Sequence, residues 1–169
     1  MESVYPETSF FSIGKGKIDF FLRQKQILLL FRNKLKNQRL HLVGPMSFSL
    51  DEKSLLRAGL DYWASLAPQV HAGWGEFEAC VVRGQTEKLH LFSGSATRSV
   101  FDAHFAPGDL LVFGSEQTGL PPALLGAYPE RCVGIPMLCG QRSLNLATAV
   151  GIGLYQALRC AGLMGHESS

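Results

Sequence analysis

The chain has 169 residues, of which 46% are hydrophobic and 18% are charged, so it is long enough for one domain with its own core and too apolar to be a disordered chain. The apolar run Ile27–Phe31 is far shorter than the roughly 20 residues that span a bilayer, and we expect no membrane segment. The net charge of +2 is unevenly distributed: residues 1–39 hold eight basic and three acidic side chains, and residues 40–169 hold eight basic and eleven acidic ones. The basic segment either contacts phosphate or is a solvated leader, and both interpretations stay open.

The cysteines and the N-terminus restrict the chemistry and the location. No C-x-x-C spacing and no paired histidines occur, which argues against a zinc site, so we expect no metal and four reduced thiols, at Cys80, Cys132, Cys139 and Cys160. No secretory signal is recognisable, and we expect a cytoplasmic protein. Organellar import stays open because Asp19 is the only acidic residue between positions 8 and 39.

Residues 1–38 form an atypical basic segment that precedes the expected domain at residues 39–169. Phe10 and Phe11 indicate a short strand. The apolar positions between Asp19 and Lys36 fit a basic amphipathic helix, which we predict there.

Residues 40–63 predict a strand followed by a helix. The apolar run at 40–43 is stopped by a Gly-Pro pair and is typical of a buried strand. His41 lies within it and is expected to pack rather than to catalyse. The helix is expected to be capped by Ser49 or Asp51 and to end near Trp63.

The middle of the chain predicts short elements in alternation. We expect a loop at Val70–Gly75, a short helix at Glu76–Val82, a strand at Lys88–Phe92, a turn at residues 105–109 and a strand at Leu110–Phe113. Strands that alternate with helices indicate an α/β fold with a mostly parallel sheet and right-handed crossovers.

Two loops in the C-terminal third each connect a buried strand to a helix. The first, residues 114–121, follows the strand at Leu110–Phe113, and the second, residues 136–145, follows a predicted strand at Val133–Ile135. The helix after the first loop begins at Pro121-Pro122. The helix after the second runs from Asn145 to Cys160, with Gly162 as its C-cap. Open α/β sheets bind ligands at the carboxyl ends of their strands, so we place the candidate site at these two loops.

The loops carry few groups that can do chemistry. Glycines flank a single carboxylate, Glu116, in the first loop, and neither a Walker sequence nor a dinucleotide fingerprint occurs, which disfavours a nucleotide-binding oxidoreductase. Asn145 either caps the following helix or bonds across to another loop. Gly151 and Gly153 in that helix would allow another backbone to approach closely.

The two loops resemble known motifs. Phe113-Gly114-Ser115-Glu116-x-x-Gly119-Leu120-Pro121, together with Ile135-Pro136-Met137 and Arg142-Ser143-Leu144-Asn145-Leu146-Ala147-x-Ala149-Val150, resembles the second and third motifs of the SPOUT superfamily of RNA methyltransferases. Leu40–Met46 with Arg57–Tyr62 looks like the group that 2′-O-methylates the wobble nucleotide of tRNA. The match covers about residues 39–162.

The resemblance implies a fold and a function. The fold would be α/β, with a mostly parallel sheet flanked by helices and a deep C-terminal trefoil knot, in a homodimer whose contact includes Tyr155. The activity would be methyl transfer from S-adenosylmethionine to a ribose 2′-hydroxyl of RNA, at the wobble C or U of tRNA, with ribosomal RNA as the alternative.

The family's functional residues carry over to named positions. The cofactor contacts would be Phe92, Gly114, Leu120, Ile135, Met137, Ser143 and Leu144. Glu116, Arg142 and Asn145 would lie at the reaction centre, and Arg32 is the candidate for the arginine that helps to remove the proton. The chain departs from the family in two ways, since residues 1–39 contain no Asn-Thr-Gly-Asn sequence and Thr118 stands where a basic residue is frequent. The alternative hypothesis is therefore a knotted homologue that binds S-adenosylmethionine or RNA without turnover.

Overall fold

The computed structural model describes residues 8–12, 39–44, 69–115, 118–138 and 144–164. Two short 3-10 helices, Thr86–Lys88 and Pro129–Arg131, precede β4 and β6. The strands and longer helices are, in chain order, β1 (Thr8–Ser12), β2 (Arg39–Val43), β3 (Gln69–His71), α4 (Trp74–Phe77), a π-helical turn (Glu78–Val82), β4 (Leu89–Phe92), β5 (Leu110–Gly114), α5 (Pro122–Ala127), β6 (Cys132–Val133) and α6 (Leu146–Cys160).

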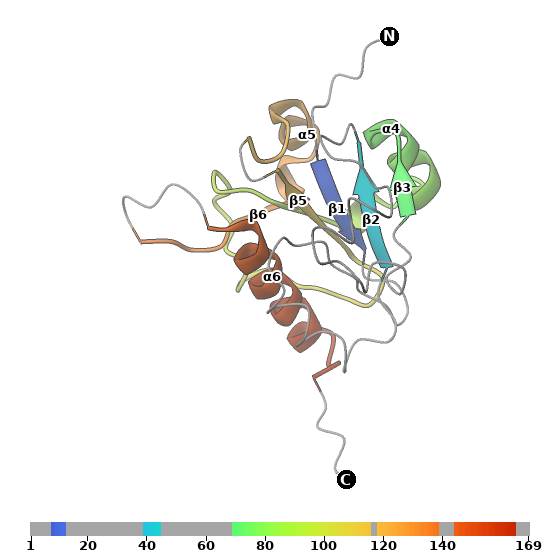
Figure 1. The fold of residues 1–169 in the computed structure, drawn as a ribbon. Coiled ribbons are helices and arrows are strands. Elements are labelled where there is room, and N and C mark those ends of the chain that lie inside the picture. Colours follow the sequence, from blue (N-terminus) through green and yellow to red (C-terminus); the bar gives the residue numbers. More distant parts are fainter. Residues whose placement is uncertain (1–7, 13–38, 45–68, 116–117, 139–143, 165–169) are drawn as a thin grey trace, which may run out of the picture.

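The strands form one six-stranded sheet in the order β3-β2-β1-β5-β4-β6. The pairs β2 with β3, β4 with β5 and β4 with β6 are parallel. Only β1 runs antiparallel to its neighbours, β2 and β5. The prediction of a mostly parallel sheet is therefore confirmed, with β1 as the exception near its centre (Figure 1).

Alternating side chains of the buried strands divide the core into two clusters, one on each face of the sheet. In β5, Leu111 and Phe113 join the cluster that α6 covers, whereas Leu110 and Val112 join the cluster under α4, the π-helical turn and α5. All residues of β5 are buried and apolar. The strand therefore does not alternate between apolar and polar residues, as is typical of a strand covered on both faces. The result is a three-layer α/β arrangement.

Sequence patterns predicted β2, β4, β5, α5 and α6 correctly, and two predictions were wrong in part. The predicted loop at 70–75 contains the strand β3 and the start of α4, because Val70 pairs with Leu42 at the edge of the sheet. The predicted strand at 133–135 ends at Val133, since Gly134 leaves the β4 ladder and forms an isolated bridge with Ser99. The strand β3 was missed because three residues at the edge of a sheet are too few to show a hydrophobic pattern.

Both ends of α6 are capped as predicted. At its start, the side-chain oxygen of Asn145 accepts a hydrogen bond from the backbone N–H of Thr148, at 3.4 Å. At its end, Gly162 adopts a left-handed conformation with φ of +69°. The N–H groups of Gly162 and Leu163 then bond to the carbonyls of Arg159 and Leu158, which is a Schellman cap.

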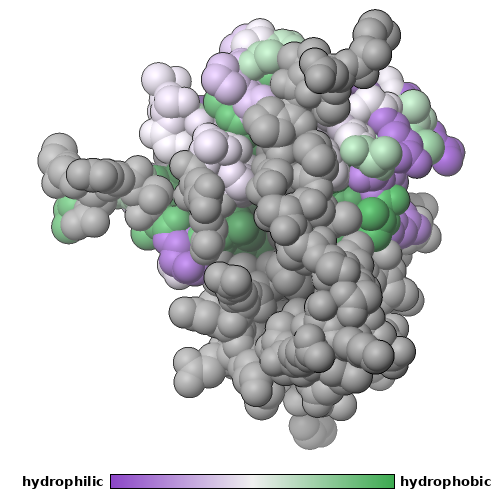
Figure 2. Space-filling model, turned by 45° about the horizontal axis from the view of Figure 1, so that its top comes forward, coloured by the Kyte–Doolittle hydropathy of each residue, from purple (hydrophilic) through white to green (hydrophobic). Residues whose placement is uncertain are grey.

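Three predictions of fold fall outside the described residues. These are the helices at Asp19–Lys36 and Ser49–Trp63 and the C-terminal knot, because the predicted knot region includes residues 116–117 and 139–143, which the structure does not describe. In the described part of the chain, no helix is long and apolar enough to cross a membrane. On the face that Figure 2 shows, hydrophobic and hydrophilic residues of the described part lie next to one another.

Candidate functional site

A cavity of about 610 Å³ lies at the carboxyl ends of β4 and β5, where the two loops were predicted to form a site. Its lining comes from the ends of both strands, from α5, from the segment after β6 and from the start of α6. Pockets of about 300 to 1,000 Å³ with mostly apolar walls and a few polar groups are typical of small-molecule sites.

Gly114 at the end of β5 allows the first loop to fold back against the strand. A Cβ on Gly114 would lie 1.9 Å from the carbonyl carbon of Gly119 and 2.2 Å from the nitrogen of Leu120, and both are backbone atoms that cannot swing aside. The returning chain is held by backbone hydrogen bonds in both directions between Ser115 and Gly119, of 3.3 and 3.0 Å. Any other residue at 114 would force this wall of the cavity outward.

Two aromatic rings at the ends of β4 and β5 form a wall of the cavity. The rings of Phe92 and Phe113 stack with centroids 4.2 Å apart. The helix α6 packs against them at Gly153, where a Cβ would lie 2.7 Å from Phe92 and 3.0 Å from Phe113. The sequence predicts that Gly151 and Gly153 admit another backbone. Gly153 instead admits two ring edges, and Gly151 has no neighbour within 4 Å of its Cβ position in the described chain.

Hydroxyl groups lie on two sides of the cavity. The hydroxyls of Ser93 and Ser95, just after β4, are 2.9 Å apart, and those of Ser115 and Thr118, in the first loop, are 2.8 Å apart. Leu120 and other apolar side chains supply much of the remaining lining. The cavity can therefore hold a ligand that has both an apolar or aromatic part and a polar part.

Six of the seven predicted cofactor residues line this one cavity: Phe92, Gly114, Leu120, Ile135, Met137 and Leu144. Asn145 follows Leu144 and is exposed at the start of α6. The other predicted site residues lie outside the described part of the chain: Ser143, Glu116, Arg142 and Arg32. Sequence reasoning missed the lining roles of Phe113, Ser93 and Thr118, although Phe113 directly precedes Gly114 in the motif of the first loop.

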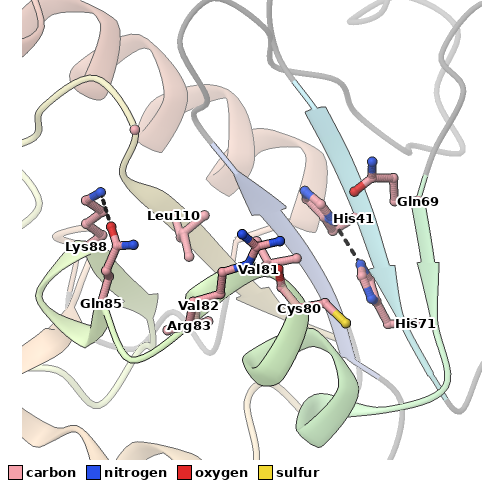
Figure 3. Close-up of a pocket in the computed structure, with 11 residues that line it drawn as sticks. His41, Gln69, His71, Cys80, Val81, Val82, Arg83, Gln85, Lys88 and Leu110 are labelled. Carbon is pink, nitrogen blue, oxygen red and sulfur yellow. Dashed lines mark hydrogen bonds between the residues drawn. The ribbon is translucent and has the colours of Figure 1, made fainter.

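A second cavity, of about 520 Å³, lies near the amino ends of β3, β4 and β5 and was not predicted (Figure 3). His41 on β2 and His71 on β3 lie side by side there, with a hydrogen bond of 3.0 Å between Nδ1 of His41 and Nε2 of His71. Burial lowers the pKa of His71, although Glu76 acts in the opposite direction. The expectation that His41 packs within a strand is confirmed, since its ring also contacts Phe77 edge-on.

A buried pair holds the turn that leads into β5. The carboxylate of Asp109 accepts hydrogen bonds from Nε2 of His90, at 2.8 Å, and from the backbone N–H of Ala106, at 2.9 Å. His90 also packs against Phe105, with ring centroids 4.3 Å apart. The pair fixes β5 relative to β4 at the end opposite the first cavity.

The described residues contain no group of three or more His, Cys, Asp or Glu side chains arranged to hold a metal ion. Cys80, Cys132 and Cys160 are free, and Cys139 lies outside the described part. Burial raises the pKa of the Cys132 thiol, followed in importance by the charge of Glu130, so this cysteine packs as a neutral thiol.

Comparison with known proteins shows to which family this chain is similar. The tRNA (cytidine(34)-2′-O)-methyltransferases of Burkholderia pseudomallei (strain 1106a) and Escherichia coli (strain K12) are 40% and 37% identical to this chain over 128 residues. Each alignment covers 75% of this chain, and 81% and 80% of the respective relative.

Solved structures match as well. One, described as giving structural insights into the 2-OH methylation of C/U34 on tRNA, is 40% identical with a TM-score of 0.62, over 72% of this chain and 78% of that one. The SpoU methyltransferase AviRb from Streptomyces viridochromogenes, solved in complex with AdoMet, is 28% identical with a TM-score of 0.58, over 77% of this chain and 49% of that one. The model of the SpoU rRNA Methylase family matches residues 33–155, which confirms the resemblance seen in the motifs, and the chain belongs to that family.

Proposed function

We propose that this protein transfers a methyl group from S-adenosylmethionine to the ribose 2′-hydroxyl of the wobble nucleotide, C or U, of tRNA. The single observation that carries the proposal is the cavity between the ends of β4 and β5, which six of the seven residues predicted to contact the cofactor line. Relatives with 37–40% identity are named for this activity. Ribosomal RNA is the alternative substrate, in keeping with the description of the matching family.

The residues of the cavity fit S-adenosylmethionine. Its volume of about 610 Å³ suits a ligand of this size. Apolar side chains such as Leu120 and Ile135 can cover the adenine, and the hydroxyl pairs at Ser93 and Ser115 can bond to polar groups of the ligand. The bound cofactor supplies an electrophilic methyl on sulfonium. Met137 and Leu144 would complete the pocket, with Ser143 as a further contact.

The chain's own contribution to the reaction is to orient the ribose and to accept its proton. We assign the first task to Asn145, which caps α6 between Leu144 and Leu146, two residues that line the cavity. We assign Glu116 and Arg142 to the same reaction centre, and Arg32 to proton removal, from the family's motifs. Nothing in the comparisons favours the alternative of a homologue that binds without turnover.

We further propose that the C-terminal third forms the family's trefoil knot and that α6 forms part of a homodimer contact. Tyr155 on α6 is 45% exposed although it is aromatic, and the nearby Gly151 leaves room for a close neighbour. A cytoplasmic location accords with a tRNA substrate.

The test is methyl transfer from labelled S-adenosylmethionine to unmodified tRNA, with the modified nucleotide mapped by mass spectrometry. We expect one 2′-O-methyl group at the wobble position. Methylation of ribosomal RNA but not of tRNA would select the other substrate. Cofactor binding without transfer to either RNA would select the alternative without turnover.

A pair of variants at Asn145 separates catalysis from folding. Asn145→Asp keeps a good N-cap, whereas Asn145→Ala removes the cap and costs about 1 kcal/mol of stability. If the amide orients the ribose, both variants lose transfer, and only the alanine variant also loses stability. Transfer by Asn145→Asp at the normal rate would remove the amide from the site.

A further inference from the structure

The second cavity has an unusual lining, because every ionisable side chain in it except the Cys80 thiol is basic. Arg83, Lys88, His41 and His71 line it together with the amides of Gln69 and Gln85, and none of the described residues that line it carries a carboxylate. A polar, open hollow of about 520 Å³ with this composition favours an anion over a cation or an apolar ligand.

Local contacts hold the two permanent cations of the cavity in place. Nε of Arg83 donates a 2.7 Å hydrogen bond to the carbonyl of Cys80, and the backbone of Arg83 is left-handed, with φ of +50°. The ammonium of Lys88 bonds to the side-chain oxygen of Gln85, and Figure 3 shows this pair across the hollow from the two imidazoles. Burial lowers the pKa of His71, so the permanent positive charges of the cavity are those of Arg83 and Lys88.

This cavity lies at the edge of the sheet opposite the cofactor cavity. Lys88 directly precedes β4 and Leu110 begins β5, whereas the first cavity is lined by the last residues of the same two strands. The chain leaves the described part at Ser12 and returns at Arg39, and both residues lie at this end of the sheet, because Ser12 pairs with Leu110 and with Arg39. Residues 13–38, between these two residues, contain seven basic side chains and one acidic one.

We propose that the second cavity binds backbone phosphates of the substrate RNA, away from the nucleotide that is methylated. The inference rests on the proposed function, which makes RNA the polyanion that this enzyme meets. A strand rises about 3.3 Å per residue, so Leu110 in the second cavity and Gly114 in the first are about 13 Å apart along β5. The site therefore contacts a part of the RNA beyond the target nucleotide, and it contributes affinity without reading sequence.

The test compares two double variants of the full chain. Arg83→Gln with Lys88→Gln removes both charges and keeps a polar, unbranched side chain at each position. Arg83→Lys with Lys88→Arg keeps both charges and serves as the matched control. Binding of unmodified tRNA is measured by filter binding from 50 to 200 mM salt, and binding of S-adenosylmethionine is measured by calorimetry.

For the glutamine variant we expect tRNA affinity to fall by roughly three- to tenfold. The slope of log affinity against log salt concentration should decrease in magnitude by about 2, because the variant no longer neutralises two phosphates. Cofactor affinity and unfolding temperature are expected to stay the same in both variants. The charge-preserving control is expected to keep the wild-type slope.

An unchanged slope in the glutamine variant, or an equal loss in the control, would overturn the phosphate site. Because binding is measured without turnover, a wild-type protein that binds tRNA but fails to methylate it would count against the proposed function alone.

Discussion

Replacement of Gly114 by alanine tests the wall of the cofactor cavity directly. The new Cβ would lie 1.9 Å from the carbonyl carbon of Gly119, where ordinary contact begins at 3.4 Å, so the returning loop must move by about 1.5 Å. That movement breaks the two backbone hydrogen bonds between Ser115 and Gly119, each worth about 1 kcal/mol, and adds about 1 to 3 kcal/mol of overpacking. We expect Gly114→Ala to lose about 3 to 5 kcal/mol of unfolding free energy in urea.

The same variant should lose cofactor binding, because the displaced residues line the cavity. We expect the affinity for S-adenosylmethionine, measured by calorimetry, to fall at least about a hundredfold, which corresponds to about 2.7 kcal/mol. Gly126→Ala is the matched control, since nothing lies within 4 Å of its Cβ position and alanine favours the helix by up to about 1 kcal/mol. A Gly114→Ala protein that folds and binds the cofactor with wild-type affinity would refute the assignment of this cavity.

Three further variants test the packing around the two cavities. Gly153→Ala pushes a Cβ to 2.7 Å from an aromatic ring. After the helix-propensity gain is subtracted, we expect a net loss of up to about 2 kcal/mol in urea together with weaker cofactor binding, and a stabilised variant would contradict the packing. Asp109→Ala leaves the buried N–H of His90 without its acceptor, so we expect the free energy of unfolding to fall by about 2 to 4 kcal/mol. Asp109→Asn should lose less, and equal losses in the two variants would argue against the hydrogen bond. Burial holds the pKa of His71 in the folded protein below 6.5, so the unfolded state binds more protons and stability is lost as pH falls through about 6.5. In urea titrations, the free energy of unfolding should differ less between pH 8 and pH 5.5 for His71→Gln than for wild type. An equal difference in both proteins would remove His71 as the cause.

The parts of the fold that the sequence predicted are those with strong local signals. The strand at Leu110–Phe113 is an uninterrupted apolar run, and its structural counterpart extends it by one residue. The helix α6 carries an N-cap at Asn145 and a C-cap at Gly162, and both caps formed. In these places local propensity and tertiary packing favour the same structure.

The features that were missed depend on contacts between distant segments. The strand β3 exists because it pairs with β2, some thirty residues earlier, and its own three residues have no strand pattern. The role of Gly153 could not be read from helical spacing, since it depends on two rings that come from β4 and β5. The second cavity brings together side chains from residues 41 to 110, a separation at which sequence patterns carry no information.

The candidate site was predictable because its residues cluster in two short loops. Phe92 is the exception, since it stands about twenty residues before the first loop and was placed in the site by family resemblance alone. Its stack with Phe113 explains why an aromatic residue is useful there: the ring supports both the cavity and the close approach of α6.

The most direct test of the account is a crystal structure of the protein with S-adenosylhomocysteine, the product of methyl transfer. We predict electron density for the ligand in the cavity bounded by Phe92, Gly114 and Leu144. Density in the cavity lined by His41 and Arg83, or no density at saturating ligand, would contradict the central claim that the carboxyl ends of β4 and β5 hold the methyl donor.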